Sequence, residues 1–437
     1  MTASSLVDRY PPSPSAPADQ GARESRSLDF SLFYFASGGS EQSADQYRLL
    51  LDGARFADSH GFAAVWTPER HFHRFGGLYP NPSVSSAAIA AITERIQIRA
   101  GSVVLPLHHP IRVTEEWAVV DNLSNGRVGV SFASGWQPED FVLAPGNYAE
   151  RKEVMYQHIE MVRKLWRGDT VTFPGATGAP VAVRTLPRPV QRELPIWVTS
   201  AGSTETYEAA GRIGANLLTH LLGQTVDELG DRIAAYRRSW EQHGHGPGRG
   251  QVTLMLHTFV GEDDDSVREI VRQPMIEYLR SSVSLIKNFA GAWAARRRKG
   301  SDATPVSGDE FQNLSREHME ALLAFAFERY FETSGLFGGA DTCLRMLERL
   351  KAIDVDELAC LIDFGVDPEI VLGHLPHLNR LKQRVNAAQP DAPSIPERIR
   401  QHRVDPHPMH ALPGPTAARG GADPGRPEHP AHRARRR

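Results

Sequence analysis

Residues 66–72 read Trp66-Thr67-Pro68-Glu69-Arg70-His71-Phe72 and extend the short apolar run 63–66 into a polar loop. Three turns of small residues follow at the spacing of βα units, each at the end of an apolar run. These turns are Gly101-Ser102, Ala133-Ser134-Gly135 and Ser200-Ala201-Gly202-Ser203-Thr204. In parallel α/β proteins the loops at the carboxyl ends of the strands converge on one ligand site. The four stretches therefore predict a single site built from strand ends.

Strand-like and helix-like segments alternate along the chain. The expected strands are residues 28–35, 63–66, 96–105, 128–132, 195–199, 215–219, 252–260 and 358–364. The expected helices are residues 44–60, 82–93, 112–123, 150–166, 203–210, 225–243, 266–290 and 369–381. Such alternation gives right-handed parallel units, and eight of them close a barrel. The predicted fold class is α/β, a TIM (β/α)8 barrel.

An extra segment interrupts the barrel pattern between the seventh and eighth strands. It covers roughly residues 290–340 and contains a helical stretch, 316–333. Insertions of this size in a βα connection are usually functional, so it is a candidate lid. The expected organisation is a disordered segment at 1–27, the barrel at 28–385, and a disordered tail at 386–437 that is rich in Pro, Arg, His and Gly.

Composition excludes several classes of protein. The chain has 437 residues, 41% of them hydrophobic, and a formal net charge of -3, which gives no electrostatic reason to expect nucleic acid or an anionic membrane as partner. Two cysteines, Cys343 and Cys360, fit buried core positions better than a disulfide or metal site. No metal is expected. No secretory signal or membrane span is recognisable, so the expected location is the cytoplasm.

Four ordered motifs carry a resemblance to a known family. They are Phe62–Trp66 with Glu69–Phe72, Val103–Pro106 with His109-Pro110, Asp121–Arg127, and Ser134–Trp136 with Asp140-Phe141. Together they resemble the bacterial luciferase-like flavin monooxygenases over residues 28–381. More narrowly, Pro68–Phe72 resembles the branch associated with polyketide and nonribosomal peptide pathways, including the mupirocin-type enzymes.

The resemblance implies an activity. It implies a two-component monooxygenase that binds reduced FMN, reacts it with O2 to a flavin C4a-peroxide, and hydroxylates an acyl or aminoacyl substrate in natural-product biosynthesis. The substrate could be tethered to an acyl or peptidyl carrier protein, whose acidic surface would suit the basic run Arg296–Lys299. The ordinary interpretation of that run is a solvated basic loop.

The resemblance also assigns cofactor-binding residues. Ser200, Ala201, Gly202, Ser203 and Thr204 combine hydroxyls with the amides of a helix start, which suits a phosphate, although such residues also cap ordinary helices. Gly101 and Ser102 match the place where this family often has a non-prolyl cis peptide beneath the flavin ring; a bulge is the alternative. Ala133, Ser134 and Gly135 match a flavin-lining turn. Luciferase has arginine where this chain has Ser134, so the charge that balances the phosphate must come from elsewhere.

The catalytic residues are less directly implied. Luciferase has Glu-His-His where this chain has Glu69-Arg70-His71, and the histidine implicated in luciferase chemistry matches Arg70. His71 becomes the candidate for proton transfer, with Glu69 and Arg70 beside it, because imidazole titrates near neutrality. The alternative is a Glu69–Arg70 ion pair with His71 only satisfying backbone groups. His109 and His257 are lesser candidates and are expected to be structural.

Two other functions and two partners remain open. A deazaflavin (F420)-dependent oxidoreductase would use the same barrel for hydride transfer, and a decayed scaffold would give a non-catalytic flavin-binding protein. The absence of a Gly-x-Gly-x-x-Gly fingerprint between a strand and a helix favours a separate flavin reductase as partner. The family commonly forms homodimers through helices that match residues 82–93 and 112–123.

Overall fold

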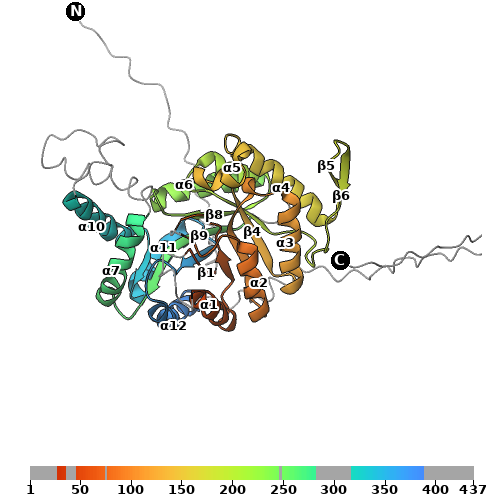
Figure 1. Cartoon of the computed structure of the whole chain (residues 1–437). Coiled ribbons are helices and arrows are strands. Elements are labelled where there is room, and N and C mark those ends of the chain that lie inside the picture. The colour runs from red at the N-terminus through yellow and green to blue at the C-terminus, as the bar shows by residue number, and fades with distance from the viewer. Residues whose placement is uncertain (1–26, 36–45, 74–75, 246–248, 282–315, 388–437) are drawn as a thin grey trace, which may run out of the picture.

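A closed parallel barrel forms the centre of the protein (Figure 1). The computed structural model describes residues 27–35, 46–73, 76–245, 249–281 and 316–387. Within these residues, eight parallel strands follow one another around the barrel: β1 (Asp29–Phe33), β2 (Ala64–Thr67), β3 (Gln97–Val104), β4 (Val128–Ala133), β7 (Ile196–Thr199), β8 (Asn216–His220), β9 (Val252–Val260) and β11 (Glu357–Leu361). The ring closes where β11 pairs with β1. The predicted (β/α)8 barrel is confirmed, and each of its strands overlaps a predicted one.

The barrel interior is filled by large side chains from alternate positions of the strands. Phe33, Trp66, Trp197 and Leu361 belong to this inner cluster. Beneath it lies the fully buried Glu357, whose carboxylate accepts hydrogen bonds from Ser31 (2.6 Å), Trp66 (3.0 Å), Arg99 (2.6 Å) and Gln251 (2.9 Å). The Arg99 guanidinium also lies over the rings of Trp66 and Trp197. These contacts join several strands, so the barrel is a packed core rather than a pore.

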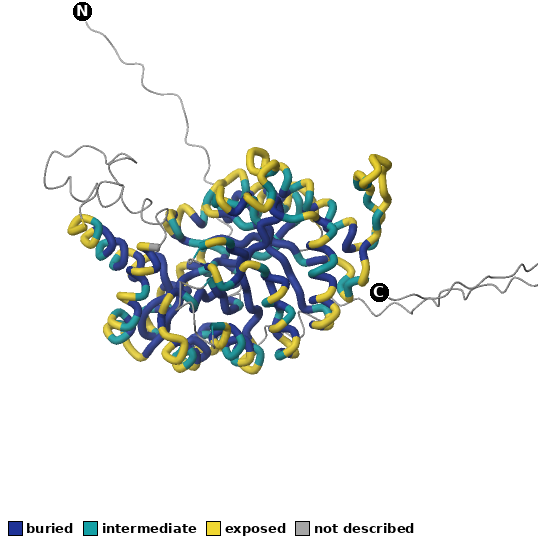
Figure 2. The backbone as a smooth tube through the Cα atoms, in the orientation of Figure 1, coloured by how far each residue is buried: buried dark blue, intermediate teal, exposed yellow. Residues whose placement is uncertain are grey.

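Helices surround the strands, with apolar faces inward and exposed faces outward (Figure 2). They are α1 (Arg48–Ser59), α2 (Pro82–Ile92), α3 (Pro110–Leu123), α4 (Arg151–Arg167), α5 (Thr204–Arg212), α6 (Val226–Gln242), α7 (Asp264–Ser281), α11 (Ala340–Ala352) and α12 (Pro368–Asn386). Short 3-10 turns η1 (Leu105–Leu107), η2 (Pro138–Leu143) and η3 (Pro145–Asn147) follow β3 and β4. Most helices match the sequence-based expectation; α11 was not among the expected elements.

The extra segment between the seventh and eighth barrel strands is present. Its described part contains α10 (Arg316–Thr333), at the predicted bounds, and a short strand β10 (Leu336–Gly338) that pairs with the end of β9. Helix α10 packs beside α7, where Glu328 forms ion pairs with Arg268 and Arg272. The basic run 296–299 lies outside the described residues.

A small antiparallel hairpin projects from the barrel after α4 (Figure 1). It consists of β5 (Val171–Pro174) and β6 (Pro180–Val183). Its residues are exposed or half-buried, so the segment lacks the apolar run that identifies a core strand. This hairpin was absent from the sequence-based expectation.

The predictions for the two ends fall almost entirely outside the described residues. Residue 27 and residues 386–387 are described, and the side-chain amide of Asn386 bonds to the backbone of Leu28, which brings the two ends of the barrel region together. Both cysteines are buried and unpaired, as expected from the sequence.

Candidate active site

A cavity of about 840 Å³ lies at the carboxyl ends of the barrel strands. The four predicted turns converge on it, as the sequence led us to expect. Of the predicted site residues, those that line it are Glu69, Arg70, Gly101, Ser102, Ala133, Ser134, Gly135, Ser200, Ala201, Gly202 and Ser203. His71 and Thr204 are not among the lining residues. The volume lies within the range of small-molecule sites.

One wall of the cavity is the backbone of β3. The Gly101–Ser102 peptide is cis, as the resemblance implied, and the pairing of β3 with β4 shifts register between Gly101 and Val103. A Cβ atom at Gly101 would lie 2.6 Å from the ring of Phe33, so only glycine fits there. The Ser102 hydroxyl bonds to that of Thr199, which also bonds to Ser131 at 2.6 Å. The wall therefore presents backbone and hydroxyls.

Glu69 is the centre of a buried polar cluster beside this wall. Its Oε1 accepts hydrogen bonds from Nε2 of His71 at 2.8 Å and from Nε2 of His108 at 2.5 Å. Its Oε2 accepts from the backbone N–H of Val104 at 2.7 Å. Burial by itself raises the pKa of Glu69, but the bonds from His108, His71 and Val104 together lower it, so the carboxylate is held ionised.

Arg70 pairs with Asp140 and not with Glu69. Its Nη1 lies 3.0 Å from Asp140 Oδ2, and its guanidinium lies 4.6 Å from the centre of the Trp136 ring. Both charged side chains are buried, and burial lowers the pKa of Arg70 and raises that of Asp140 despite their mutual attraction. The alternative of a Glu69–Arg70 ion pair with an idle His71 is wrong, because two histidines occupy Glu69 instead.

The turn after β4 forms another part of the wall. Gly135 has a φ of 82°, and a Cβ atom there would lie 2.8 Å from Phe141 and 2.9 Å from Val104. Glycine is thus required by both the backbone and the packing. Ala133 and Ser134 complete the turn, and Trp136 carries it to the surface with 57% of its area exposed.

The N-terminus of α5 opens onto the cavity. Its N-cap Ser203 makes no side-chain capping bond, so the first-turn N–H groups are left without a side-chain acceptor. The hydroxyl of Ser200 is buried and has no hydrogen-bond partner. The guanidinium of Arg232 comes within 3.9 Å of where a Cβ of Gly202 would lie, and it bonds to Gln224. This corner offers several donors and positive charge, from Arg232 behind Gly202 and from Arg212, which lines the cavity.

Several polar residues at or beside the cavity are not among the sequence-predicted ones, and three of them are described here. His108 follows η1 and reaches Glu69 across 39 positions of sequence. Arg232 comes from α6, far from the small-residue turns. His220 ends β8 and lines the cavity; its Nδ1 accepts from the N–H of Leu222 at 3.2 Å, and burial lowers its pKa to about 4. His220 is therefore neutral at physiological pH, with Nε2 as its N–H donor.

The two lesser histidine candidates have structural contacts, as expected. His109 is the N-cap of α3, where Nδ1 accepts from the N–H of Ile111 at 3.3 Å. His257 is fully buried, and its Nδ1 lies 2.7 Å from the hydroxyl of Tyr330. Burial lowers the pKa of His257 to about 3, so it stays neutral.

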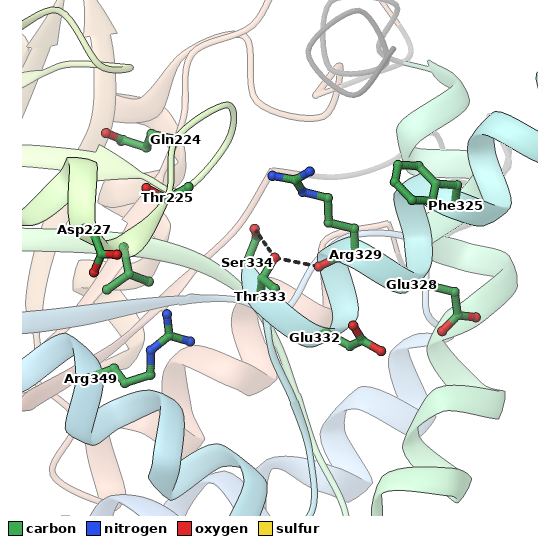
Figure 3. Close-up of a pocket in the computed structure, with 11 residues that line it drawn as sticks. Gln224, Thr225, Asp227, Phe325, Glu328, Arg329, Glu332, Thr333, Ser334 and Arg349 are labelled. Atoms are coloured by element: carbon green, nitrogen blue, oxygen red, sulfur yellow. Dashed lines mark hydrogen bonds between the residues drawn. The ribbon is translucent and has the colours of Figure 1, made fainter. Parts of the chain in front are cut away.

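A second cavity, of about 690 Å³, lies between the β8–α6 loop and helices α10 and α11. Arg329 and Arg349 project toward the space that Asp227 also faces (Figure 3). None of the sequence-predicted site residues lines it, and its positive and negative side chains are mixed. No described residue of α10 lines the strand-end cavity, so the described part of the candidate lid borders this second space instead.

Among the described residues, no group of three or more His, Cys, Asp or Glu side chains is placed to hold a metal ion. None of their helices combines the length and apolar character needed to cross a membrane.

A parallel barrel with one cavity built from its βα turns defines a (β/α)8 enzyme scaffold with a small-molecule site. The sequence model of the luciferase-like monooxygenases matches residues 28–357, well over half of the chain. The chain belongs to this family. Membership and the relatives confirm the expected enzyme class, a flavin-dependent oxidoreductase.

Individual proteins agree with the family assignment. The oxygenase component of a flavin-dependent trigonelline monooxygenase from Acinetobacter baylyi is 26% identical over 354 residues, covering 78% of this chain and 91% of the relative. The structure resembles the monooxygenase RslO1 of Streptomyces bottropensis, with a TM-score of 0.62, 24% identity and coverage of 81% and 98%. It also resembles the oxygenating constituent of 3,6-diketocamphane monooxygenase of Pseudomonas putida, solved with FMN, with a TM-score of 0.63, 17% identity and coverage of 81% and 97%. Likeness at these identities shows the shared fold.

Proposed function

We propose that this protein is the oxygenase component of a two-component monooxygenase, which takes reduced FMN and O2 at the strand-end cavity. The observation that carries the proposal is the corner at the start of α5. A buried Ser200 hydroxyl without a partner stands beside an uncapped helix N-terminus and a guanidinium. Buried polar groups are nearly always hydrogen-bonded, so an orphaned hydroxyl beside a helix start suits an anionic ligand.

The phosphate of FMN fits this corner. Ser200 and Ser203 would donate hydroxyl hydrogen bonds, and the N–H groups around Gly202 and Thr204 would supply the helix-terminal donors. Arg232 would supply the positive charge, in place of the arginine that luciferase carries at the position of Ser134. Residues 200–204 would therefore bind the phosphate, as expected from the sequence, together with Arg232.

The flavin ring would lie against the backbone wall of the cavity. Gly101 and Ser102 expose backbone there, and Ala133, Ser134 and Gly135 add only small side chains to the adjoining wall. Apolar side chains such as Val104, Met155 and Met255 complete the lining. The lining thus combines apolar side chains for a ring system with polar side chains that can fix its orientation.

When bound, reduced FMN would supply the electrons that reduce O2. The protein itself would contribute charged side chains and hydrogen-bond donors close to the flavin. Glu69 and Arg70 line the cavity, and His71, which does not line it, donates a hydrogen bond to Glu69. The three residues would therefore act as a unit rather than His71 acting alone. His220 would offer a neutral N–H donor from the opposite strand β8.

The electrons would come from a separate flavin reductase. The A. baylyi relative is itself an oxygenase component, which supports this division of labour. Direct reduction of FMN by NADH or NADPH with this protein alone would contradict it.

We further propose an acyl or aminoacyl substrate from a natural-product pathway, free or carried on an acyl or peptidyl carrier protein. Support comes from the Pro68–Phe72 motif and from the apolar lining that leads to the half-exposed Trp136. The carrier would meet the basic run Arg296–Lys299. Reversing these four charges should weaken turnover of a carrier-bound substrate and leave a free analogue unaffected; equal turnover of the tethered substrate would reject the docking role.

Cofactor binding tests the proposed function. Ultrafiltration with FMN, riboflavin and F420, each reduced under anaerobic conditions, should show retention of reduced FMN over riboflavin. Ser200→Ala and Arg232→Met should lower FMN retention and leave riboflavin retention unchanged, since riboflavin lacks the phosphate. Preferred retention of F420 would favour the deazaflavin-dependent oxidoreductase. FMN retention without any oxygen-dependent product would favour a non-catalytic flavin-binding protein.

A further inference from the structure

Glu69 links the cavity to the protein surface through His108. Its carboxylate is 1% exposed and lines the cavity, whereas the His108 side chain is 32% exposed. The 2.5 Å contact between Glu69 Oε1 and His108 Nε2 joins these two positions directly. A buried carboxylate of the cavity is thus one hydrogen bond away from a side chain that reaches solvent.

The hydrogen-bond pattern fixes the donors. An ionised carboxylate only accepts, so both His71 and His108 must donate from Nε2. The N–H of Val104 occupies Oε2, which leaves Oε1 as the atom shared by the two imidazoles.

The charges around His108 favour its protonated form. Burial lowers its pKa, but the hydrogen bond that His108 donates to Glu69, the charge of Glu69 and the charge of Glu116 on α3 together raise it. His71 faces the same Glu69 oxygen, and its charge also acts on Asp140, the partner of Arg70. A cationic imidazole next to a buried carboxylate is a stored proton close to the cavity.

We propose that His108 and Glu69 form the proton-entry path from solvent to the strand-end cavity, with His71 as the positioning residue that holds the Glu69 oxygen. The proposal rests on the monooxygenase function given above. Overall, the monoanion of reduced FMN, O2 and a substrate C–H become oxidised FMN, a substrate C–O–H group and water only if one proton is taken up from outside.

The transfer is balanced at every atom. The N–H bond at His108 Nε2 breaks while an O–H bond forms at Glu69 Oε1. That O–H bond then breaks as the proton passes to a basic oxygen in the cavity, and Glu69 returns to its carboxylate form. His108 is then neutral, with its remaining hydrogen on Nδ1. When the ring swings from Glu69 toward solvent, Nε2 takes up a hydrated proton, and the cationic imidazole returns to its contact with Glu69. Two short transfers thus deliver one proton and regenerate both groups.

Other histidines near the cavity are poorly suited to this role. The Nδ1 atom of His220 accepts from Leu222, and burial keeps that ring neutral. His109 is used as the N-cap of α3. In the described part of the chain, His108 is the histidine that combines solvent exposure with a direct bond to a carboxylate of the cavity.

The test compares His108→Gln with the control His109→Asn. Glutamine keeps an N–H donor for Glu69 but cannot pass a proton, and asparagine preserves the cap of α3. Nitrogen NMR of the flavin-free protein should show the His108 Nε2–H bonded to Glu69 in the wild type and lose that signature in Glu69→Gln. This readout is independent of any activity.

The kinetic readout is proton uptake. Anaerobic protein with reduced FMN is mixed with oxygen in a weakly buffered solution of an indicator dye, which measures proton uptake. The measurement also works without substrate, because the formation of hydrogen peroxide takes up the same proton. His108→Gln should slow proton uptake about 10²-fold, abolish its pH dependence, and leave reduced-FMN affinity unchanged. Added imidazole should restore the rate in His108→Ala, and His109→Asn should behave as the wild type.

The outcomes separate the two proposals. Proton uptake by His108→Gln at the wild-type rate, in protein that binds reduced FMN normally, would overturn the proton path and leave the monooxygenase function intact. Failure of the wild type to bind reduced FMN would overturn the proposed function, and the path with it. If Glu69→Gln loses the NMR signature but takes up protons at the wild-type rate, the Glu69–His108 bond is only structural.

Discussion

Arg70 and Asp140 form a buried ion pair at the cavity wall. The two side chains are 5% and 7% exposed, and each has one polar atom, Arg70 Nε and Asp140 Oδ1, that is buried without a partner. Burial of such a pair is costly, as the shifts of both pKa values toward the neutral forms indicate. The pair is poor for stability and its Arg70 lines the cavity, so ligand binding explains it more readily than folding does.

Removing one partner of this pair should destabilise the folded protein more than removing both partners. Arg70→Met leaves Asp140 buried and unpaired and should lower the free energy of unfolding by about 3 kcal/mol. The double variant Arg70→Met/Asp140→Leu should recover most of that loss. Urea unfolding of the three proteins measures the coupling. Additive losses in the double variant would show that the two charges do not interact strongly.

The Glu69–His108 contact should make stability depend on pH. The pKa of Glu69 is lowered from 4.5, so its contribution is complete above about pH 4.5 and is lost as the pH falls through the folded value. The pKa of His108 is raised from 6.5, so its contribution is complete below about pH 6.5 and is lost as the pH rises through the folded value.

The stability difference between the wild type and Glu69→Gln should therefore be largest between about pH 4.5 and about pH 6.5. Urea unfolding across the pH range, with His109→Asn as the reference variant, measures it. A difference that stays constant from acid to mildly alkaline pH would show that the contact carries no charge coupling.

For individual residues, the sequence predicts best those whose role depends on neighbours close by in the chain. Glu69, Gly101, Gly135 and Ser200 stand in recognisable strand-end turns, and the structure brings all of them to the cavity. His108 and Arg232 depend on contacts with distant loops, which a single sequence does not reveal. The Arg70–Asp140 pair spans 70 positions, and for the same reason it was not foreseen when a local pair with Glu69 was considered as the alternative.

Two helix N-termini in the protein are built for different purposes. Helix α6 begins with a complete capping box, in which Thr225 accepts from the N–H of Glu228 and Glu228 accepts from the N–H of Thr225. Helix α5 begins with Ser203, which makes no capping bond. The first N-terminus is satisfied by its own residues, and the second keeps its donors available.

Alanine substitutions should separate these two roles. Thr225→Ala should lower the free energy of unfolding by about 1 kcal/mol and leave FMN affinity unchanged. Ser203→Ala should change stability by less than about 0.5 kcal/mol and weaken FMN binding about tenfold, the effect of losing one hydrogen bond to a charged group. Calorimetry and thermal unfolding measure both quantities. A stability loss in Ser203→Ala without weaker FMN binding would assign Ser203 to ordinary capping.

Elements with a strong apolar period are the ones that the sequence predicts well. Each of the eight barrel strands overlaps an apolar run that the sequence shows. The β5–β6 hairpin and α11 were not predicted. The hairpin has no buried face, whereas α11 has one, formed by Cys343, Met346, Leu347 and Leu350, and follows directly on the insertion, where the barrel pattern was interrupted.

For the whole molecule, the surface of α2 and α3 suggests how two copies would meet. Val84, Val119 and Leu123 expose 67%, 44% and 58% of their area on these neighbouring helices. Exposed apolar residues on adjoining helices are common at subunit interfaces, which supports the predicted homodimer. Light scattering should give a dimeric mass for the wild type and a monomeric mass for Val119→Arg/Leu123→Arg. A monomeric wild type would reject the prediction.

The central claim is that the strand-end cavity holds reduced FMN and controls its reaction with oxygen. The most direct test mixes anaerobic protein and reduced FMN with oxygenated buffer and follows the absorbance of oxidised FMN by stopped flow. We predict that the wild type delays the appearance of oxidised FMN clearly relative to free reduced FMN, and that Ser200→Ala shortens the delay by weakening binding. Oxidation at the rate of free reduced FMN, with the wild type and the variant alike, would contradict the account.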